Sequence, residues 1–297
     1  MIALPLLGAP VARRLRTETD KNVTTLRHRG VVPGLAVVVA TDNEATLWYV
    51  RSIARAADKA GVNCTVVDLG ADAGADEIAS TLSLLSADED VHGIILQTPL
   101  PPGVDGDELV AHISAAKDVD GANPLSLGRL AVGQEAFAPA TARAVVELLE
   151  HHRVSLAGRH VTVVGRSAVV GKPLLLLLLQ RDATVTVCHS RSQPLERYTS
   201  EAGIVVAAVG RPGLLTGDHV RPGAVVVDVG TNVLENGELV GDVDPVSMTE
   251  VASALTPVPG GVGTVTTALL VLHTTQAALR LTEELASVPT VGAGAPS

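Results

Sequence analysis

The sequence predicts a two-lobed α/β protein in which each lobe has a parallel sheet covered by helices, and three observations predict it. Short β-branched runs that are apolar on both faces alternate with Ala- and Leu-rich stretches, a pattern typical of parallel βαβ units. The length of 297 residues fits two domains, at about 150 residues each. A segment rich in Pro, Gly and Asp, residues 99–134, separates the two groups of strands.

The individual elements follow from this alternation in chain order. The β-branched runs predict strands at Leu35–Ala40, Thr65–Leu69, Gly93–Gln97, Val161–Gly165, Thr184–Cys188, Ile204–Val209 and Ala224–Val229. The stretches rich in Ala and Leu predict helices at Thr46–Ala60, Ala75–Ser86, Pro139–His151 and Pro173–Arg181. A last helix is expected at 265–287, after a loop rich in Pro and Gly.

We expect the domain boundary at the start of the helix that leads into the strand at Val161. Residues 1–138 then form the first domain, completed by the helix at 265–287, and residues 139–264 form the second. The tail 288–297, VPTVGAGAPS, is expected to be disordered. Two lobes joined in this way leave a cleft between them, which is a common place for a small ligand.

The charge balance argues against nucleic acid and anionic membranes as partners. The chain has 22 basic and 32 acidic residues, a net charge of −10, and its longest run of Lys and Arg is the pair Arg13-Arg14. Binding to a phosphate backbone needs a concentrated positive surface. Aromatic residues make up only 1% of the chain, so platforms on which exposed bases could stack are not expected either.

Cysteine usage and hydropathy predict a soluble protein of the cytoplasm. Cys64 and Cys188 are far apart and neither belongs to a CxxC pair, so neither a disulfide framework nor a metal cluster is expected. The run Leu174–Leu179 is bounded by polar residues and falls far short of the roughly 20 residues that span a bilayer. The N-terminal basic residues follow an apolar run instead of preceding it, which is the wrong order for a secretory signal.

The segment VTVVGRSAVVGKP, residues 161–173, is the first with a chemical signature. A strand enters a turn with Gly165 and Gly171 and continues into a helix. Amides at a helix N-terminus suit a phosphate, and glycine lets a pyrophosphate approach closely. The spacing is not the GxGxxG fingerprint, so a plain βα loop is the alternative interpretation.

The next strand ends in Cys188-His189-Ser190-Arg191, without the acid that an NAD-preferring site usually presents to the ribose 2′-hydroxyl. Arg166, Ser190 and Arg191 could instead receive a 2′-phosphate. The alternative is that each is a solvated loop residue.

Two further segments combine glycine with proline or acidic residues. AKDVDGANPLSLGRL, residues 116–130, is placed where the first lobe should open onto the cleft. Its DVDG lacks the EF-hand spacing with the terminal Glu, so no calcium loop and no other metal site is predicted. TPVPGGVGTVTTA, residues 256–268, has two prolines and three glycines and is either a rigid entry to a helix or a wall against a flat ligand.

Six strings occur in order over about residues 5–285: IILQTPLPPG, KDVDG, VVGRSxxVGKP, VTVCHS, GDVD and TPVPGGVG. Together they resemble the bifunctional methylenetetrahydrofolate dehydrogenase/cyclohydrolase family. The resemblance implies an N-terminal lobe that binds the folate, a C-terminal Rossmann lobe that binds NADP, and a homodimer.

The resemblance also implies roles for individual residues. The family's active-site tyrosine, its glutamine and its pterin-binding aspartate correspond to Tyr49, Gln97 and Asp120, and these are the expected catalytic and folate-binding groups. The remaining positions are Gly260 and Gly261 at the folate edge, and Gly165, Arg166, Ser167, Ser190, Arg191 and Thr231 for the cofactor. A carboxylate can accept paired hydrogen bonds from the pterin edge, and a tyrosine ring can stack on its face.

One departure from the family motif concerns the chemistry directly. The family has a lysine four residues after its tyrosine, on the same helical face, and this chain has Ile53 there. Smaller departures occur at Asn123, Ala140, Ala142 and Thr264.

The resemblance and the departure together predict a specific activity. Hydride transfer from methylenetetrahydrofolate chiefly requires that two rings be held together, whereas opening of the methenyl ring by water needs a proton relay that isoleucine cannot supply. We therefore expect an NADP-dependent dehydrogenase with weak or absent cyclohydrolase activity. The alternatives are a fully bifunctional enzyme with another relay, a paralogue that acts on a related pterin, and a non-catalytic folate- or NADP-binding protein. A shikimate-type dehydrogenase is disfavoured by KDVDG and PVPGGVG.

Overall fold

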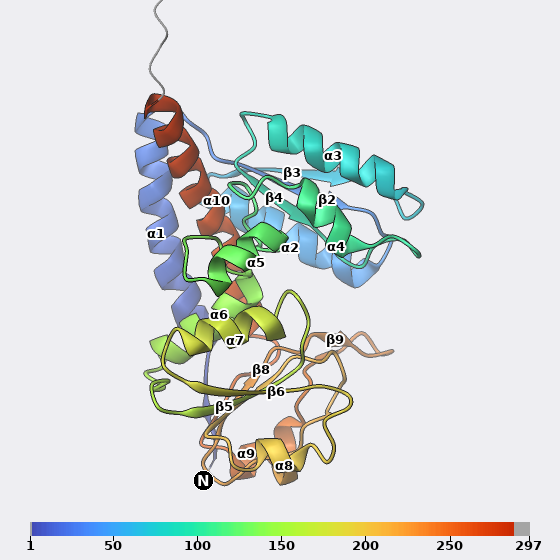
Figure 1. Ribbon diagram of the computed structural model, residues 1–297, viewed down its shortest axis with the longest axis vertical. Helices are drawn as coiled ribbons and strands as arrows, with labels where there is room; N and C mark the ends of the chain where they lie inside the picture. Colours follow the sequence, from blue (N-terminus) through green and yellow to red (C-terminus); the bar gives the residue numbers. More distant parts are fainter. Residues whose placement is uncertain (1, 288–297) are drawn as a thin grey trace, which may run out of the picture.

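The first half of the chain forms a three-stranded parallel sheet in the order β3–β2–β4, as the computed structural model of residues 2–287 shows (Figure 1). Its strands are β2 (Gly34–Val39), β3 (Asn63–Asp68) and β4 (Gly93–Leu96). Every residue of β2 is buried, which explains why its sequence, GLAVVV, is apolar throughout instead of alternating. The crossovers are α2 (Glu44–Ala60) and α3 (Ala75–Ala87).

Helix α2 carries the predicted catalytic tyrosine, and its ends are fixed by local signals. The Asn43 side chain accepts a hydrogen bond from the amide of Thr46, and the helix ends at Gly61 with a φ of 75°. Both are standard terminating devices, since Asn caps orphan amides and glycine adopts the left-handed conformation without strain.

Short helices complete this half after β4. They are α4 (Gly106–Leu109), a 3₁₀ turn at Val110–His112 and α5 (Pro124–Ala131). Asn123 caps helix α5, because its side chain accepts a hydrogen bond from the Leu125 amide, and Pro124 is the first residue of the helix.

The second half forms a six-stranded parallel sheet in the order β1–β11–β8–β7–β5–β6. Its strands are β1 (Leu4–Pro5), β5 (His160–Val164), β6 (Thr184–Cys188), β7 (Ile204–Ala207), β8 (Val225–Asp228) and β11 (Ala254–Leu255). The helices around it are α7 (Gly171–Leu179), α8 (Glu196–Thr199) and α9 (Pro245–Val251), with a 3₁₀ turn at Gly217–His219. A small hairpin of β9 (Asn232–Val233) and β10 (Leu239–Val240) follows β8.

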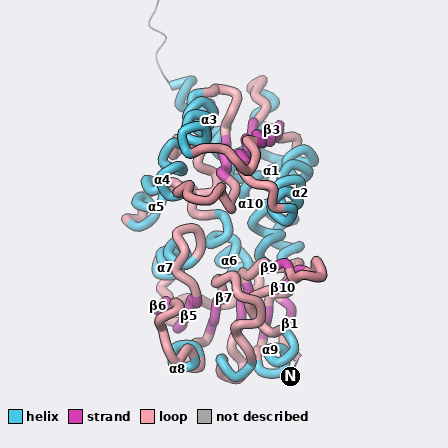
Figure 2. Tube along the Cα trace, turned by 90° about the vertical axis from the view of Figure 1, so that its right-hand side faces the viewer, coloured by secondary structure: helices cyan, strands magenta, loops and turns pink. Residues whose placement is uncertain are grey.

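Three helices join the two halves: α1 (Gly8–His28), α6 (Ala140–His151) and α10 (Val262–Ser287). Helices α1 and α10 lie side by side along one flank, and α6 lies between the two sheets (Figures 1 and 2). Residues Val262–Glu283 of α10 are long and apolar enough to cross a membrane by composition, but 72% of that window is buried inside the fold. Its hydropathy is therefore explained by packing against α1, α2 and α6.

The expected strands and helices lie within a few residues of the observed ones. Not predicted were helix α1, the short helices α4, α5, α8 and α9, and the two-residue strands β1, β9, β10 and β11. Strand β1 pairs with β11 through Leu4 and Ala254, so the first residues of the chain belong to the sheet of the second half. The second domain, which we expected at residues 139–264, therefore also shares its sheet with strand β1. The tail expected to be disordered, 288–297, lies outside the described residues.

Candidate active site

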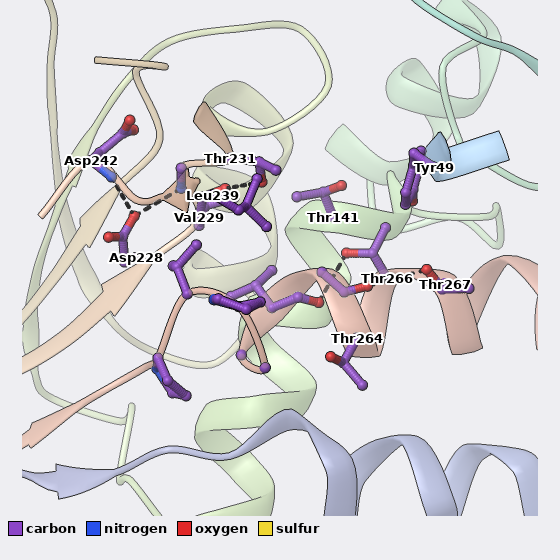
Figure 3. A pocket seen from close by; sticks show the side chains of 18 of the residues that line it. Tyr49, Thr141, Asp228, Val229, Thr231, Leu239, Asp242, Thr264, Thr266 and Thr267 are labelled. Carbon is purple, nitrogen blue, oxygen red and sulfur yellow. Dashed lines mark hydrogen bonds between the residues drawn. The ribbon is translucent and has the colours of Figure 1, made fainter. Parts of the chain in front are cut away.

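A cavity of about 550 Å³ opens between the two halves, with helix α2 of the first half on one side and the loops that follow the second sheet on the other (Figure 3). Helix α2 supplies Trp48, Tyr49 and Ser52, and the loop after β8 supplies residues 229–231. The wall between them is the loop 257–261 and the first turns of α10. The cavity is therefore lined by the predicted tyrosine, by Thr231, and by both glycines expected at the folate edge.

Tyr49 points from α2 toward the hydroxyl-bearing face of α10 (Figure 3). Burial raises the pKa of Tyr49 above its ordinary value, the nearby charge of Asp120 raises it further, and the side chain of Thr267 opposes the rise. The phenol is thus neutral at physiological pH, and its hydroxyl can donate a hydrogen bond to a ligand.

The two aspartates of KDVDG have different tasks. The carboxylate of Asp118 is fully buried and accepts the amides of Ala122 and Asn123, each at 2.9 Å. It therefore closes the turn and is not free to bind a ligand. Asp120 is partly exposed, and its pKa is raised to about 7 by burial and by the charge of Asp118, while the amide of Ala140 opposes the rise.

Asp120 and Gln97 lie outside the cavity wall, unlike Tyr49. Neither lines the 550 Å³ cavity, although Asp120 acts electrostatically on Tyr49. Gln97 follows the end of β4, and its side-chain amide donates to the carbonyl of Thr98 at 3.1 Å. The roles expected for Asp120 and Gln97 therefore stay predictions.

The two glycines of the predicted cofactor loop lie where the backbone is closely packed. Gly165 has a φ of 132°, and any Cβ there would collide with the carbonyl of Ala208; a Cβ on Gly171 would collide with the carbonyl of Gly165. Both positions are thus restricted to glycine by close backbone packing. The hydroxyl of Ser167 accepts the amide of Val170 at 3.2 Å, which fixes the loop ahead of α7.

The polar side chains around this loop fit a phosphorylated dinucleotide. Arg166 and Ser167 are exposed after β5, and Ser190 and Arg191 are exposed after the neighbouring strand β6. The carboxyl ends of adjacent parallel strands form one edge, where doubly wound sheets bind nucleotides. Two guanidinium groups and two hydroxyls at this edge suit the charge of NADP.

A pair of buried aspartates, which the sequence analysis missed, organises the loops beside the cavity. Asp228 accepts the amides of Gly230, Asp242 and Val243 at 2.9 to 3.0 Å. Asp242 in turn accepts the amides of residues 209, 210 and 211. Glycines 230 and 241 would clash with these carboxylates if they carried a Cβ, and the DVG and GDVD strings were the signal for this clamp.

Burial raises the pKa of Asp228 to about 6, and the amides that it accepts hold it below the value that burial alone would give. Both of its carboxylate oxygens accept backbone amides. Asp228 therefore supports the loop that carries Thr231.

The loop TPVPGGVG forms a rigid wall of the cavity. Gly260 has a φ of 106°, and a Cβ at Gly261 would lie 2.6 Å from the carbonyl oxygen of Pro257. The Gly260 carbonyl accepts the Gly8 amide at 2.8 Å, which anchors the wall to α1. A ligand can thus approach the backbone here without meeting side chains.

Ile53, at the position of the family lysine, is fully buried. Its exposed fraction is 0%, and it belongs to the main hydrophobic core together with Val50 and Ala57 of the same helix. Tyr49 lies one helical turn before it and packs against that core. A charged side chain at this position would have no contact with water.

Comparisons with known proteins decide the family. Residues 6–120 match the catalytic domain of tetrahydrofolate dehydrogenase/cyclohydrolase, and residues 139–282 match the NAD(P)-binding domain of the same enzymes. The chain belongs to the tetrahydrofolate dehydrogenase/cyclohydrolase family. A relative from Paenarthrobacter aurescens, named bifunctional protein FolD 1, is 64% identical over 92% of this chain and 93% of its own length.

Solved structures agree with this assignment. The bifunctional FolD dehydrogenase/cyclohydrolase from Campylobacter jejuni superposes with a TM-score of 0.90 at 36% identity, over 94% of this chain and 99% of that one. The FolD enzyme of Trypanosoma brucei, solved with NADP and an inhibitor, gives a TM-score of 0.88 at 34% identity, over 97% of this chain and 100% of that one.

These findings confirm the predicted family, the two-domain α/β fold class and NADP as the cofactor of the second domain. They also confirm the assignment as a methylenetetrahydrofolate dehydrogenase. Several relatives are named bifunctional, so weak or absent hydrolysis remains a prediction. In the described part of the chain, no three His, Cys, Asp or Glu residues gather as metal ligands would.

Proposed function

We propose that this protein oxidises 5,10-methylenetetrahydrofolate to 5,10-methenyltetrahydrofolate with NADP and hydrolyses the product to 10-formyltetrahydrofolate weakly or not at all. The observation that carries the proposal is Ile53, whose side chain is apolar and fully buried one turn after Tyr49. Loss of a positioned general acid or base typically costs about 10²- to 10⁴-fold in rate.

In the oxidation, the residues of this chain bind and orient the folate. NADP supplies the hydride acceptor when it is bound. We assign Asp120 to the hydrogen-bonding edge of the pterin, Tyr49 to its face and Gln97 to the support of the same ring. The bare backbone at Gly260 and Gly261 lets the folate lie close to the cofactor, which is the positioning that hydride transfer needs.

Cofactor binding is assigned to the loop after β5 and the end of β6. Gly165 and Ser167 offer the backbone and hydroxyl contacts for the pyrophosphate, and Thr231 lies on the cavity wall at the nicotinamide side. Arg166, Ser190 and Arg191 are assigned to the 2′-phosphate.

A fully bifunctional enzyme is the second candidate, and one observation favours it. Asp120 has a pKa of about 7 and acts electrostatically on Tyr49, so the pair could relay protons near neutral pH without a lysine. To separate the two candidates, methenyltetrahydrofolate is supplied directly and its disappearance is followed with and without the protein. Our proposal expects rates close to the spontaneous one, whereas the second candidate expects a rate that scales with protein concentration.

Arg166→Ala is expected to weaken NADP binding by about tenfold or more and NAD binding by less than about threefold. The reason is that a charge-assisted hydrogen bond to the 2′-phosphate is available only to NADP. Calorimetric titration of each nucleotide measures the difference. Arg159→Ala serves as the control, because Arg159 is also exposed but precedes β5 at the opposite end of the strand. Equal losses for both nucleotides would contradict the assignment.

The value of kcat/KM for methylenetetrahydrofolate is expected to rise with pH through an ionisation near 7. Asp120 has its pKa raised to about 7 by burial, so below that pH the carboxyl is neutral and one oxygen no longer accepts hydrogen bonds from the pterin. Rate profiles for wild type and Asp120→Asn test this, and the variant should lose the ionisation. A wild-type profile that is flat between about pH 6 and 8 would contradict the role of Asp120.

We also propose a homodimer located in the cytoplasm, as the family resemblance implies. Strand β3 is at the edge of its sheet and exposes Val66, a feature that a second copy could cover. Light scattering on the purified protein should then give twice the chain mass of 30.4 kDa. A single-chain mass at micromolar concentration would contradict the dimer.

A further inference from the structure

His273 is a buried histidine of α10 that the proposed chemistry does not use. Its side chain has an exposed fraction of 0%, and its Nδ1 lies 2.7 Å from the carbonyl oxygen of Val119. Val119 is the residue between the two aspartates of KDVDG. The ring also packs against Phe137, with 5.0 Å between ring centroids.

The partners of His273 fix its tautomer. A backbone carbonyl can only accept a hydrogen bond, so Nδ1 carries the proton and donates it to Val119. On the other side of the ring, a guanidinium nitrogen of Arg143 lies 3.4 Å from Nε2, and a guanidinium can only donate. The imidazole is therefore neutral, with its two nitrogens committed to opposite roles.

Arg143 is itself held in place by α6, the helix on which it lies. Its Nε donates to the Glu147 carboxylate at 3.2 Å, and Glu147 also pairs with Arg14 of α1. The guanidinium is thus oriented before it meets the histidine. A continuous chain of contacts runs from α1 and α6 through His273 to the carbonyl of Val119.

The turn that carries Asp120 is anchored at three points, and His273 is the anchor on α10. The Asp118 carboxylate holds the amides that follow the turn, the Asp120 carbonyl accepts the Ala140 amide at 3.2 Å, and His273 holds the carbonyl before Asp120. Helix α10 also carries Thr267, the residue that contacts Tyr49. A displacement of Val119 would therefore change how Asp120 lies relative to Tyr49.

We propose that His273 is a positioning residue for the folate site: the hydrogen bond from its Nδ1–H to the carbonyl of Val119 fixes the position of Asp120 relative to Tyr49. The proposal rests on the folate role assigned to Asp120 above. His273 does not touch the ligand, and it exchanges no proton with it. His273 acts on the ligand only indirectly, by holding the turn next to Asp120 in place.

The test removes the hydrogen bond and then restores it. His273→Leu deletes the donor, and we expect the Kd for the folate and the KM for methylenetetrahydrofolate to rise by about 10- to 100-fold, because small displacements of binding groups have effects of that size. The dissociation constant for NADP, which binds the other domain, should stay within about twofold. His273→Asn places an amide N–H near the position of Nδ1 and should bring folate affinity back to within about threefold of wild type.

Thr275→Val is the matched control on the same helix. Thr275 is fully buried, and its hydroxyl bonds to Leu272 and to Asn22 of α1, so the variant loosens α10 without touching the KDVDG turn. We expect it to lower thermal stability and leave the folate Kd within about twofold. Should His273→Leu not fold, His273→Phe removes the donor and keeps a ring.

The proposal would be overturned by an apolar variant that binds folate as wild type does, or by an asparagine variant no better than the apolar one. A folate defect of equal size in Thr275→Val would overturn it as well. Binding is measured with folate alone, so the comparison stands even if the wild type fails to oxidise methylenetetrahydrofolate. Failure of the wild type to oxidise methylenetetrahydrofolate would instead refute the proposed function.

Discussion

Replacing Asp120 with alanine is expected to abolish measurable folate binding and dehydrogenase turnover while NADP affinity stays within about twofold of wild type. The carboxylate is the group assigned to the paired donors of the pterin edge, and an unpaired donor in a desolvated site costs about 1–3 kcal/mol for each bond lost. The residues assigned to the cofactor lie in the other domain, so we expect NADP binding not to change. Calorimetry with each ligand separately measures both effects.

Asp105→Ala is a suitable control for the loss of one carboxylate near this lobe. Asp105 caps α4 through the amide of Asp107, and its replacement should lower stability slightly and leave both ligands bound. If Asp120→Ala binds folate as wild type does, KDVDG is only a structural turn. Asp118 already performs that structural task through its amide contacts.

The second large effect is expected from Ile53→Lys, which should create cyclohydrolase activity. Tyr49 remains one helical turn away, and the introduced amine would supply the missing general acid and base. Burial disfavours the charged form, so the pKa of that lysine should lie below its ordinary value of about 10.4. The hydrolysis rate of methenyltetrahydrofolate should accordingly depend on pH with a midpoint below that value.

A stability cost accompanies this gain, because the site is dry. Ile53 has an exposed fraction of 0% in the main core, and an amine without full hydrogen bonding there should lower the free energy of unfolding by about 1–3 kcal/mol. Ile53→Met is the control, since it has similar volume and no charge. Hydrolysis by the methionine variant equal to that of the lysine variant, with both retaining NADP binding, would contradict the argument.

The regular elements could be predicted from the sequence because their signals are local. Central strands such as β2 are apolar runs like GLAVVV, a pattern typical of a buried parallel strand. The edge strands β3 and β6 are more exposed and were predicted from their β-branched residues. Helix α1 was missed although its buried positions, among them Val11, Leu15 and Leu26, recur at the three- and four-residue spacing of an amphipathic helix. Its partner α10 is distant in sequence, so the pairing of the two helices has no local signal. Two-residue strands such as β1 exist only through pairing with a remote segment.

The candidate site was predictable only in part, for a similar reason. The resemblance placed Tyr49, Gly260 and Gly261, and the structure brings all three to one cavity. It could not show that Asp118 closes a turn while Asp120 stays available, because both are aspartates two residues apart. The DVG and GDVD strings marked the residues of the Asp228 and Asp242 clamp, but not the loop amides that the carboxylates hold. The contact of His273 with Val119 joins residues 154 positions apart, which no local pattern encodes.

The most direct test of the proposed function is the product ratio in a single reaction. Purified wild-type protein is given methylenetetrahydrofolate and NADP, and NADPH, methenyltetrahydrofolate and 10-formyltetrahydrofolate are quantified together over time. The account predicts that methenyltetrahydrofolate accumulates in step with NADPH and that the formyl product appears only at the spontaneous rate. Formyl product that keeps pace with NADPH, far above the spontaneous rate, would show that the chain hydrolyses its own product without a lysine at position 53, and it would contradict the account.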